Sequence, residues 1–467
     1  MTSSPSLGTD LVRRLRQGEL TSAALTEACL GQVERLEGEL RAFVTVTPDV
    51  ARARAAEADA VLADGRSLGS LHGLPVAIKD NIDTAGIRTT VGSAFFRDRV
   101  PDADAEVWRR LEAAGAVLIG KAQLHEFAYG ATTQNPHHGS CRNPWDTARI
   151  PGGSSGGSGS SVAAGMAAAA LGTDTGGSVR IPASLNGLSG IRPTLGRVPN
   201  TGVFYVAWSF DTVGPLARSI ADCAEILAVM SGYCPTDPMS VDRPVEDFVA
   251  ALSAGTAGLR VGVPRNFFFE DIDADIVALV RAAADVLADL GVSVEDVDVP
   301  GIEEANDACT RIIWAEAYAQ HRERLAEQPS LFGEDLQRRL VLAHDVAGHD
   351  YARYRQLGRR WRRTLAELFE RVDVLLSPTA GTDVPEVGSE MIETTVRLTH
   401  LTYGWSLAGL TALSIPCGFA QSGMPVGLQL AAAPWGEADL IRLAAAYESA
   451  TSWHERQPPL ATAAPAA

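Results

Sequence analysis

The chain has only two lysines, Lys79 and Lys121, although forty of its residues are lysine or arginine. Arginine side chains stay protonated in proteins and cannot act as general bases, whereas a desolvated lysine can accept a proton. Lys79 stands near the end of residues 73–80, which read Gly-Leu-Pro-Val-Ala-Ile-Lys-Asp. An arginine-rich composition explains the low number of lysines equally well. Evidence that Lys79 is a base must therefore come from the segments downstream.

Two glycine- and serine-rich segments follow. Residues 151–161 read PGGSSGGSGSS, and residues 172–182 read GTDTGGSVRIP. Such tracts are often flexible linkers. Here, however, residues 162–171 between them are apolar and almost all small, which predicts a tightly packed interior helix. Both segments are therefore expected to belong to a folded site.

Successive glycines let several backbone N–H groups point at one spot, which creates an anion-binding concavity. Beside a serine hydroxyl, such a concavity is an oxyanion hole. Ser178 directly follows the second glycine pair. The predicted oxyanion donors are the N–H groups of Thr175, Gly176 and Gly177.

A serine hydroxyl is a poor nucleophile until a neighbour takes its proton. The nine histidines are scattered, and no Ser-His-Asp pattern is evident. A neutral Lys79 amine can take the proton if burial lowers its pKa. Ser154 can relay that proton, because a hydroxyl accepts from one partner while donating to another. These residues predict that Ser178 attacks an amide carbonyl and that water hydrolyses the acyl-enzyme without a cofactor.

The same motifs resemble the amidase signature family, in which a lysine and two serines form the catalytic triad. The resemblance rests on GGSSGGS, on DTGGS-x-R-x-P-A-S and on Lys79 within G-x-P-x-x-x-K-D, and it covers about residues 65–220. It continues more weakly through LLSPT, LAGL and GLQ in the last third of the chain. By position, it implies Ser178 as nucleophile, Lys79 as base and Ser154 as the bridging serine that the family holds after a cis peptide bond.

Neighbouring polar residues carry more than one interpretation. Ser155 could support the relay, but a loop hydroxyl bonded to backbone is the favoured interpretation. Asp174 and Arg180 bracket Ser178 with opposite charges, which favours a structural ion pair over a chemical role. Asp80 follows Lys79 on the opposite side of a strand and is predicted to anchor a loop.

Rival motifs are weaker. Residues 152–156 match G-x-S-x-G, but the preceding residues are turn-like rather than the strand that a nucleophile elbow needs. Residues 115–122 come one residue short of a P-loop, and Ala122 replaces the magnesium-binding hydroxyl. His137 and His138 lack the spacing of a metal motif, so no metal site is predicted.

Composition favours a soluble enzyme. Hydrophobic residues make up 46% of the chain, enough for a large core. The formal net charge of -17 disfavours nucleic acid or an anionic membrane as a partner. Six widely spaced cysteines without a paired motif fit a reducing cytoplasm. The N-terminus carries no signal-peptide pattern, and no apolar run is long enough to span a bilayer.

Helical and strand patterns alternate as in α/β folds. Helices are predicted at 8–17, 21–39, 48–63, 104–114, 218–231, 274–290, 304–326, 333–370 and 437–450. Strands are predicted at 75–78, 116–119, 259–263, 292–299, 372–376, 412–415 and 427–430.

The family resemblance implies a large mixed β-sheet covered by helices on both faces. Residues 1–64 form an N-terminal helical segment packed on the core, and residues 65–467 form the amidase signature domain. The N-terminal helices lie largely outside the motif region, which leaves open a homodimer in which they pack against a second copy of the chain.

The most favoured function is hydrolysis of a small-molecule carboxylic amide. Aromatic residues near the motifs favour an apolar or aryl substrate, including anilides and carbamates, although each could equally be a core residue. The candidate pocket residues are Tyr129, Phe204, Trp208, Trp314 and Trp405.

Two alternatives remain. One is the glutaminase subunit of a tRNA-dependent amidotransferase, which would bring partner chains and aminoacyl-tRNA. As we align them, such proteins carry an acidic residue shortly before the LAGL motif, where residues 397–400 here read Arg-Leu-Thr-His. Residues 123–127 also depart from their usual Asn-Met-Asp-Glu-Phe, so a stand-alone hydrolase is favoured. The other alternative, a non-catalytic binding protein on this fold, is disfavoured because Lys79, Ser154 and Ser178 are all present.

Overall fold

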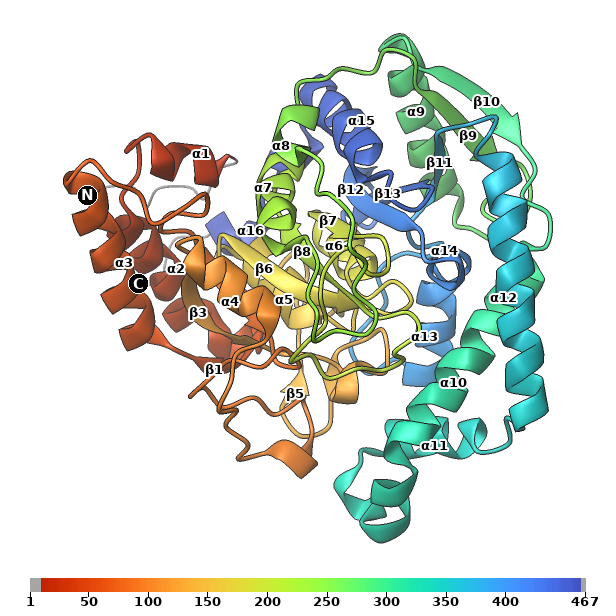
Figure 1. Cartoon of the computed structure of the whole chain (residues 1–467), viewed down its shortest axis with the longest axis horizontal. Coiled ribbons are helices and arrows are strands. Elements are labelled where there is room, and N and C mark those ends of the chain that lie inside the picture. Colours follow the sequence, from red (N-terminus) through yellow and green to blue (C-terminus); the bar gives the residue numbers. More distant parts are fainter. Residues whose placement is uncertain (1–9, 463–467) are drawn as a thin grey trace.

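A large mixed sheet forms the centre of the molecule (Figure 1). The computed structural model describes residues 10–462, and within this range the sheet has 11 strands in the order β1-β3-β2-β6-β8-β7-β12-β13-β11-β9-β10. The strands are β1 (Phe43–Val46), β2 (Pro75–Lys79), β3 (Val117–Ala122), β6 (Ala169–Asp174), β7 (Ser189–Arg192), β8 (Thr212–Ala217), β9 (Arg260–Pro264), β10 (Ser293–Val297), β11 (Val374–Pro378), β12 (Thr411–Phe419) and β13 (Pro425–Ala432). A separate small ladder pairs β4 (Gln134–Asn135) with β5 (Gly139–Ser140).

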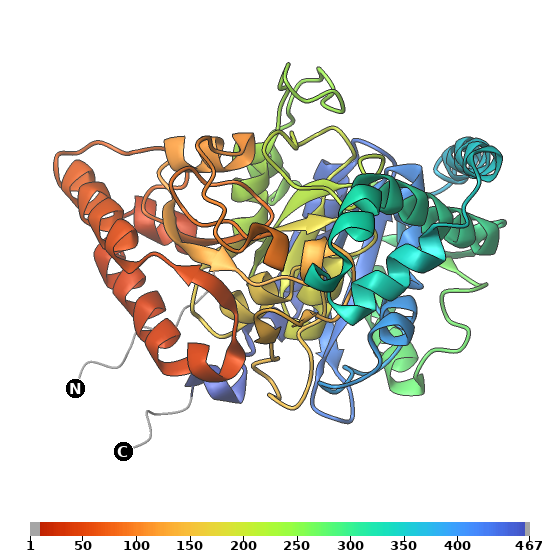
Figure 2. The same cartoon turned by 90° about the horizontal axis from the view of Figure 1, so that it is seen from below.

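Helices cover both faces of the sheet. They are α1 (Leu11–Arg16), α2 (Ser22–Leu40), α3 (Pro48–Ala63), α4 (Glu106–Ala113), α5 (Gly156–Ala163), α6 (Arg180–Asn186), α7 (Ile220–Met230), α8 (Phe248–Ala251), α9 (Ala274–Asp289), α10 (Ile302–Glu327), α11 (Glu334–Ala343), α12 (Gly348–Leu368), α13 (Met391–Thr399), α14 (Tyr403–Ala408), α15 (Glu437–Ala450) and α16 (Pro459–Thr462). Short 3₁₀ turns lie at Ala94–Phe96, Glu126–Ala128, Pro329–Leu331 and Trp453–Glu455. Helices α5 and α6 pack on one face, and Figure 2 shows α7 on the other.

Two helical groups lie at the ends of the sheet (Figure 2). Helices α2 and α3 pack together and against β3, and Leu25, Leu30 and Val33 form the buried side of α2, as their helical spacing predicts. At the other end, α10 contacts α11, α12 and α14.

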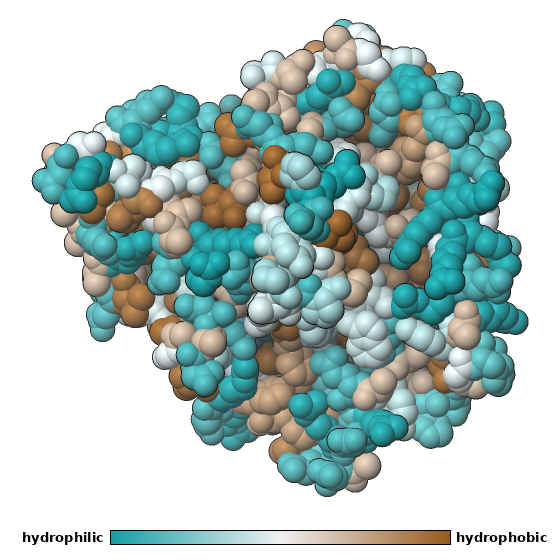
Figure 3. Space-filling view, in the orientation of Figure 1, coloured by the Kyte–Doolittle hydropathy of each residue, from teal (hydrophilic) through white to brown (hydrophobic). Residues whose placement is uncertain are grey.

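The face of the molecule seen in Figure 3 is largely polar. Hydrophilic residues cover most of the face shown in Figure 3, and hydrophobic residues appear there in small, separated groups. None of the helices in residues 10–462 combines the length and the apolar character that a membrane crossing needs.

Three central strands bring the candidate residues together. β2 lies between β3 and β6 and runs parallel to both. The carboxyl ends of parallel strands meet at one edge of a sheet, where open α/β sheets place their ligands. Lys79 ends β2 and Asp174 ends β6, so the two segments that the sequence singled out meet at this edge.

The helix predicted over residues 162–171 is wrong. Gly165, at φ +73°, follows the end of α5, and the chain then enters the buried strand β6. Alanine favours a helix in isolation, but here its small side chain lets α5 pack closely on a strand that is buried between β2 and β8.

The helix predicted over residues 333–370 is interrupted. The chain turns at residues 344–347, which separates α11 from α12. Strands β1, β7 and β8 were not predicted, because they are short or rich in glycine and small residues. The first predicted helix begins at residue 8, and residues 8 and 9 lie outside the described range.

Candidate active site

Lys79 and Ser154 are in direct contact. The Nζ of Lys79 donates to the Ser154 Oγ and to the Thr173 Oγ1, each at 2.7 Å. The lysine side chain is fully buried. Burial lowers its pKa from 10.5 to about 7, and the charges of Asp211 and Asp174 oppose this shift only in part. A neutral amine at this position can accept a proton near neutral pH.

The chain around Ser154 is held by backbone contacts. The Ser154 carbonyl accepts from the N–H of His125 at 3.1 Å, and the Thr133 hydroxyl donates to the Gly152 carbonyl at 2.8 Å. A Cβ on Gly153 would lie 2.8 Å from the backbone of Ala131, so only glycine fits there. The Gly153–Ser154 peptide bond is cis, as the family resemblance implied.

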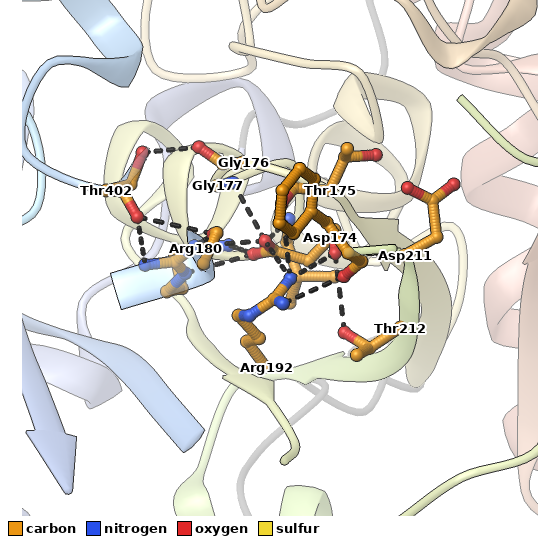
Figure 4. Close-up of polar contacts among 12 residues, drawn as sticks. Asp174, Thr175, Gly176, Gly177, Arg180, Arg192, Asp211, Thr212 and Thr402 are labelled. Atoms are coloured by element: carbon orange, nitrogen blue, oxygen red, sulfur yellow. Dashed lines mark hydrogen bonds and ion pairs between the residues drawn. The ribbon is translucent and has the colours of Figure 1, made fainter. Parts of the chain in front are cut away.

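Ser178 stands on the loop between β6 and α6, and the carboxylate of Asp174 organises this loop (Figure 4). Asp174 accepts from the N–H groups of Gly177 at 2.8 Å and Val179 at 3.2 Å. It also accepts from the Arg180 guanidinium at 3.0 Å through both of its oxygens. The predicted Asp174–Arg180 ion pair is therefore present, fully buried, and it fixes the backbone on both sides of Ser178.

A second arginine completes this charge cluster. Arg192 donates to the Asp174 carboxylate at 3.0 Å and to the Thr175 carbonyl at 3.4 Å. Burial raises the pKa of Asp174, but Arg180 and Arg192 outweigh it and hold that pKa well below its usual range. Asp174 thus stays ionised and keeps the loop in one conformation.

Glycine is required at both positions before Ser178. A Cβ on Gly176 would lie 2.2 Å from the ring of Tyr403, and Gly177 has a φ of +128°. The hydroxyl of Thr402 donates to the Gly176 carbonyl (Figure 4). The loop is therefore clamped against residues 402–403 as well as against Asp174.

The predicted oxyanion donors divide into two kinds. The N–H of Gly177 points at Asp174, so it is already occupied and the prediction needs correction at this residue. Within the described residues, the N–H groups of Thr175, Gly176 and Ser178 have no hydrogen-bond partner. These three remain available to a developing oxyanion.

Two cavities lie next to each other, and Ser178 lines the inner one. The inner one, of about 20 Å³, is lined by Ala128, Tyr129, Gly130, Ala131, Thr175, Gly176, Ser178, Val206, Ile313, Thr395, Thr399 and Tyr403. The outer one, of about 80 Å³, shares Tyr129, Thr395, Thr399 and Tyr403 with it and adds Asn306, Thr310, Trp314, Arg339, Leu342, Ile392, Val396 and His400. The four shared residues form the boundary between the cavity at Ser178 and the outer one.

The amidase family model matches residues 24–441. The chain belongs to the amidase family. It is 41% identical to a glutamyl-tRNA(Gln) amidotransferase subunit of Roseiflexus sp. (strain RS-1), over 97% of each chain. It is 40% identical to an amidase of Pseudomonas putida, over 96% of this chain and 97% of that one.

A solved structure supports the same assignment. It comes from work on a vestigial protein complex that reveals the evolutionary origins of an s-triazine catabolic enzyme. The present chain matches that structure with a TM-score of 0.90 and 35% sequence identity, over 95% of this chain and 98% of that one. The predicted family, the mixed sheet with helices on both faces and the assignment as an amidohydrolase are confirmed.

The predicted pocket aromatics do not all lie at the cavities of the amidase. Tyr129 and Trp314 line them. Trp405 is 1% exposed and stacks among aromatic rings in the core. Phe204 packs in a separate aromatic cluster, and Trp208 is 41% exposed at the surface. Residue type alone does not tell which side of a helix or loop an aromatic ring occupies.

The remaining candidates have structural contacts. The Ser155 hydroxyl donates to the Thr173 carbonyl and accepts from the Thr173 N–H, both at 3.2 Å, which is the predicted role of a loop hydroxyl bonded to backbone. Asp80 accepts from the Thr90 N–H at 2.8 Å and so anchors a loop as predicted. In residues 10–462, no group of three or more His, Cys, Asp or Glu side chains is arranged to hold a metal ion.

Sequence reasoning missed Thr173, Arg192, Asp211 and Thr402. Thr173 was missed because it stands in the glycine-rich segment 172–182, which was not predicted to begin in a strand; a strand assignment would have placed alternate side chains on the Lys79 side. The other three come from distant segments. Only the fold brings them to the Ser178 loop.

Proposed function

We propose that this amidase hydrolyses a small carboxylic amide, with Ser178 as nucleophile, Ser154 as relay and Lys79 as general base. The observation that carries the proposal is the 2.7 Å contact between the buried Lys79 amine and the Ser154 hydroxyl. A lysine whose pKa is about 7 is matched to proton transfer at neutral pH.

The cycle needs only residues of the chain and water. Ser178 attacks the amide carbonyl while its proton passes through Ser154 to Lys79. The free N–H groups of Thr175 and Gly176 bind the oxyanion, an interaction that strengthens as charge develops. The relay then returns the proton to the leaving nitrogen, and water hydrolyses the acyl-enzyme by the same path in reverse.

A second candidate function is that of a glutaminase subunit, and the 41% identity with the Roseiflexus protein favours it. The lining of the two cavities argues against a glutaminase, because no carboxylate is among the lining residues. The α-ammonium of glutamine would lack a counter-charge there, and an unpaired buried charge is costly. We therefore place a stand-alone amidase first.

The test is amine or ammonia release by the isolated chain with aliphatic amides, anilides, carbamates and glutamine. Ser178→Ala serves as the blank, because it removes only the nucleophilic oxygen. We expect turnover of amides that disappears in the blank. Activity that survives Ser178→Ala contradicts the assignment, and activity on glutamine alone that requires an added partner protein supports the second candidate. Size-exclusion chromatography of the same sample checks the homodimer.

A further inference from the structure

The hydroxyl of Tyr129 has no partner in the described chain. Tyr129 is 6% exposed, and its hydroxyl oxygen is buried without a hydrogen bond. Buried polar groups are nearly always bonded, and leaving one unbonded costs stability. Burial also raises the pKa of Tyr129 far above its usual value, so the group remains a neutral hydroxyl. No contact within the described residues explains why a hydroxyl is present at this buried position.

The position of Tyr129 supplies a reason. Its side chain lines both the inner cavity beside Ser178 and the outer cavity, so it stands at the boundary between them. The ring is held in place, because the Arg339 guanidinium lies 5.7 Å from its centroid. Arg339 is in turn fixed by Asp335 at 2.8 Å and by the Thr395 hydroxyl at 2.9 Å. The hydroxyl is therefore held in a fixed position, where it can bond a molecule that occupies the cavities.

A second polar group without a partner lies farther out. Asn306 lines the outer cavity, and its side-chain oxygen is buried and unbonded in the described residues. Asn306, Thr310 and Trp314 are spaced four residues apart on α10, which puts them on one side of the helix. That side offers a substrate both a hydrogen-bonding amide and an aromatic surface.

Much of the rest of the outer cavity is apolar, including Leu342, Ile392 and Val396. Leu342 is 49% exposed and Val396 61% exposed, so both stand at the outer end of that cavity. The charge of Arg339 is matched by Asp335. The outer cavity thus suits an uncharged molecule with a polar group part-way along its length.

We propose that Tyr129 is a specificity-determining residue that hydrogen-bonds, through its hydroxyl, to a second amide group of the substrate, with Asn306 bonding farther along that group. The inference rests on the proposed function of Ser178. It narrows the substrate class to uncharged diamides with a slim apolar remainder. Simple alkyl amides and charged amides such as glutamine are expected to be weaker substrates.

The test compares glutaramide, a diamide, with hexanamide, which has a similar length and lacks the second amide. For the wild type, we expect a higher kcat/KM for glutaramide. Tyr129→Phe should reduce this preference about tenfold, the size of one lost hydrogen bond, mainly through a higher KM for glutaramide. Its melting temperature should not fall, because the change removes an unbonded buried oxygen. Tyr447→Phe, at a tyrosine that is 1% exposed and not among the residues lining either cavity, is the matched control.

Equal preference in wild type and Tyr129→Phe, or a lower melting temperature with equal loss on both amides, would overturn the inference. Failure of the proposed function looks different, since the wild type would then be silent on every amide. For that case the Ser178→Ala variant is used as a binding scaffold. Glutaramide should raise its melting temperature, and this rise should shrink when Tyr129→Phe is added. An unchanged rise, or no rise in either variant, also overturns the inference.

Discussion

Lys79 and Lys121 lie on neighbouring strands, and their surroundings differ more than their burial. Both are 0% exposed, and the register pairs Lys79 with Ala122, one residue beyond Lys121. Burial lowers the pKa of Lys79 to about 7 and that of Lys121 to about 8. By burial alone, either lysine could be a base.

The two lysines differ in the groups that accept their hydrogen bonds. Lys79 donates to the hydroxyls of Ser154 and Thr173, at the edge of the sheet where Ser178 stands. Lys121 donates to the Ile82 carbonyl and to the hydroxyls of Thr84 at 3.0 Å and Thr89 at 2.9 Å.

The three acceptors of Lys121 match the three protons of an ammonium group, whereas the third contact of Lys79, to the Thr173 carbonyl, is long at 3.5 Å. The nearby charge of Asp80 also favours the protonated form of Lys121. On the proposed mechanism, a buried lysine acts as a base only where its acceptor leads to a reacting group. Elsewhere it is a structural cation.

The largest effect should come from Lys79→Arg. Arginine keeps the positive charge but cannot accept the proton, so kcat/KM should fall by about 10²–10⁴, nearly as far as in Lys79→Ala. Amide hydrolysis measured beside circular dichroism separates lost chemistry from lost folding. Substantial turnover by the arginine variant would refute the base role.

Lys121→Met should instead reduce stability. The change leaves the Ile82 carbonyl and the hydroxyls of Thr84 and Thr89 without their donor, and an unsatisfied buried group costs about 1–3 kcal/mol in the free energy of unfolding. Urea denaturation measures this loss, and adding Asp80→Asn should recover part of it. If Lys121→Met unfolds like the wild type but loses turnover, the two lysines have been assigned the wrong way round.

The pH profile sharpens the same contrast. Lys79 must be neutral to accept a proton, so kcat/KM should rise about tenfold per pH unit up to its pKa of about 7 and level off above it. Initial rates between pH 5 and 9 give this curve. A flat profile down to pH 5 is incompatible with a lysine base, provided that the fold is intact at that pH.

The smallest effect should be that of Ser155→Ala. Its hydroxyl only exchanges hydrogen bonds with the Thr173 backbone, so the loss should be about 1 kcal/mol of stability with kcat/KM unchanged. Ser154→Ala, one residue away, is the matched comparison and should lose most activity. Equal loss of turnover in the two variants would place Ser155 in the relay.

The candidate residues of the site could be proposed because chemistry limits residue type. A lysine base has only two candidates in this chain, and Gly176 is needed where Tyr403 leaves no room for a Cβ. Long amphipathic helices such as α2 were predictable for a similar reason, because their buried face repeats with the helical period.

What could not be predicted depends on tertiary contacts. Strand β6 is alanine-rich, and only its place between β2 and β8 makes it a strand. Loop geometry determines that the Gly177 N–H donates to Asp174, and packing determines that Trp405 is buried in the core. No local pattern contains that information.

The clamp on the Ser178 loop also sets when this enzyme can first work during its own synthesis. Arg180 donates to Gln429, which follows it by 249 residues. At about 5–20 residues per second, a ribosome needs roughly 12–50 s to make that stretch. Ser178, Ser154 and Lys79 are thus synthesised long before Gln429 is available to Arg180. This contact on the loop can therefore form only after almost the whole chain has been made.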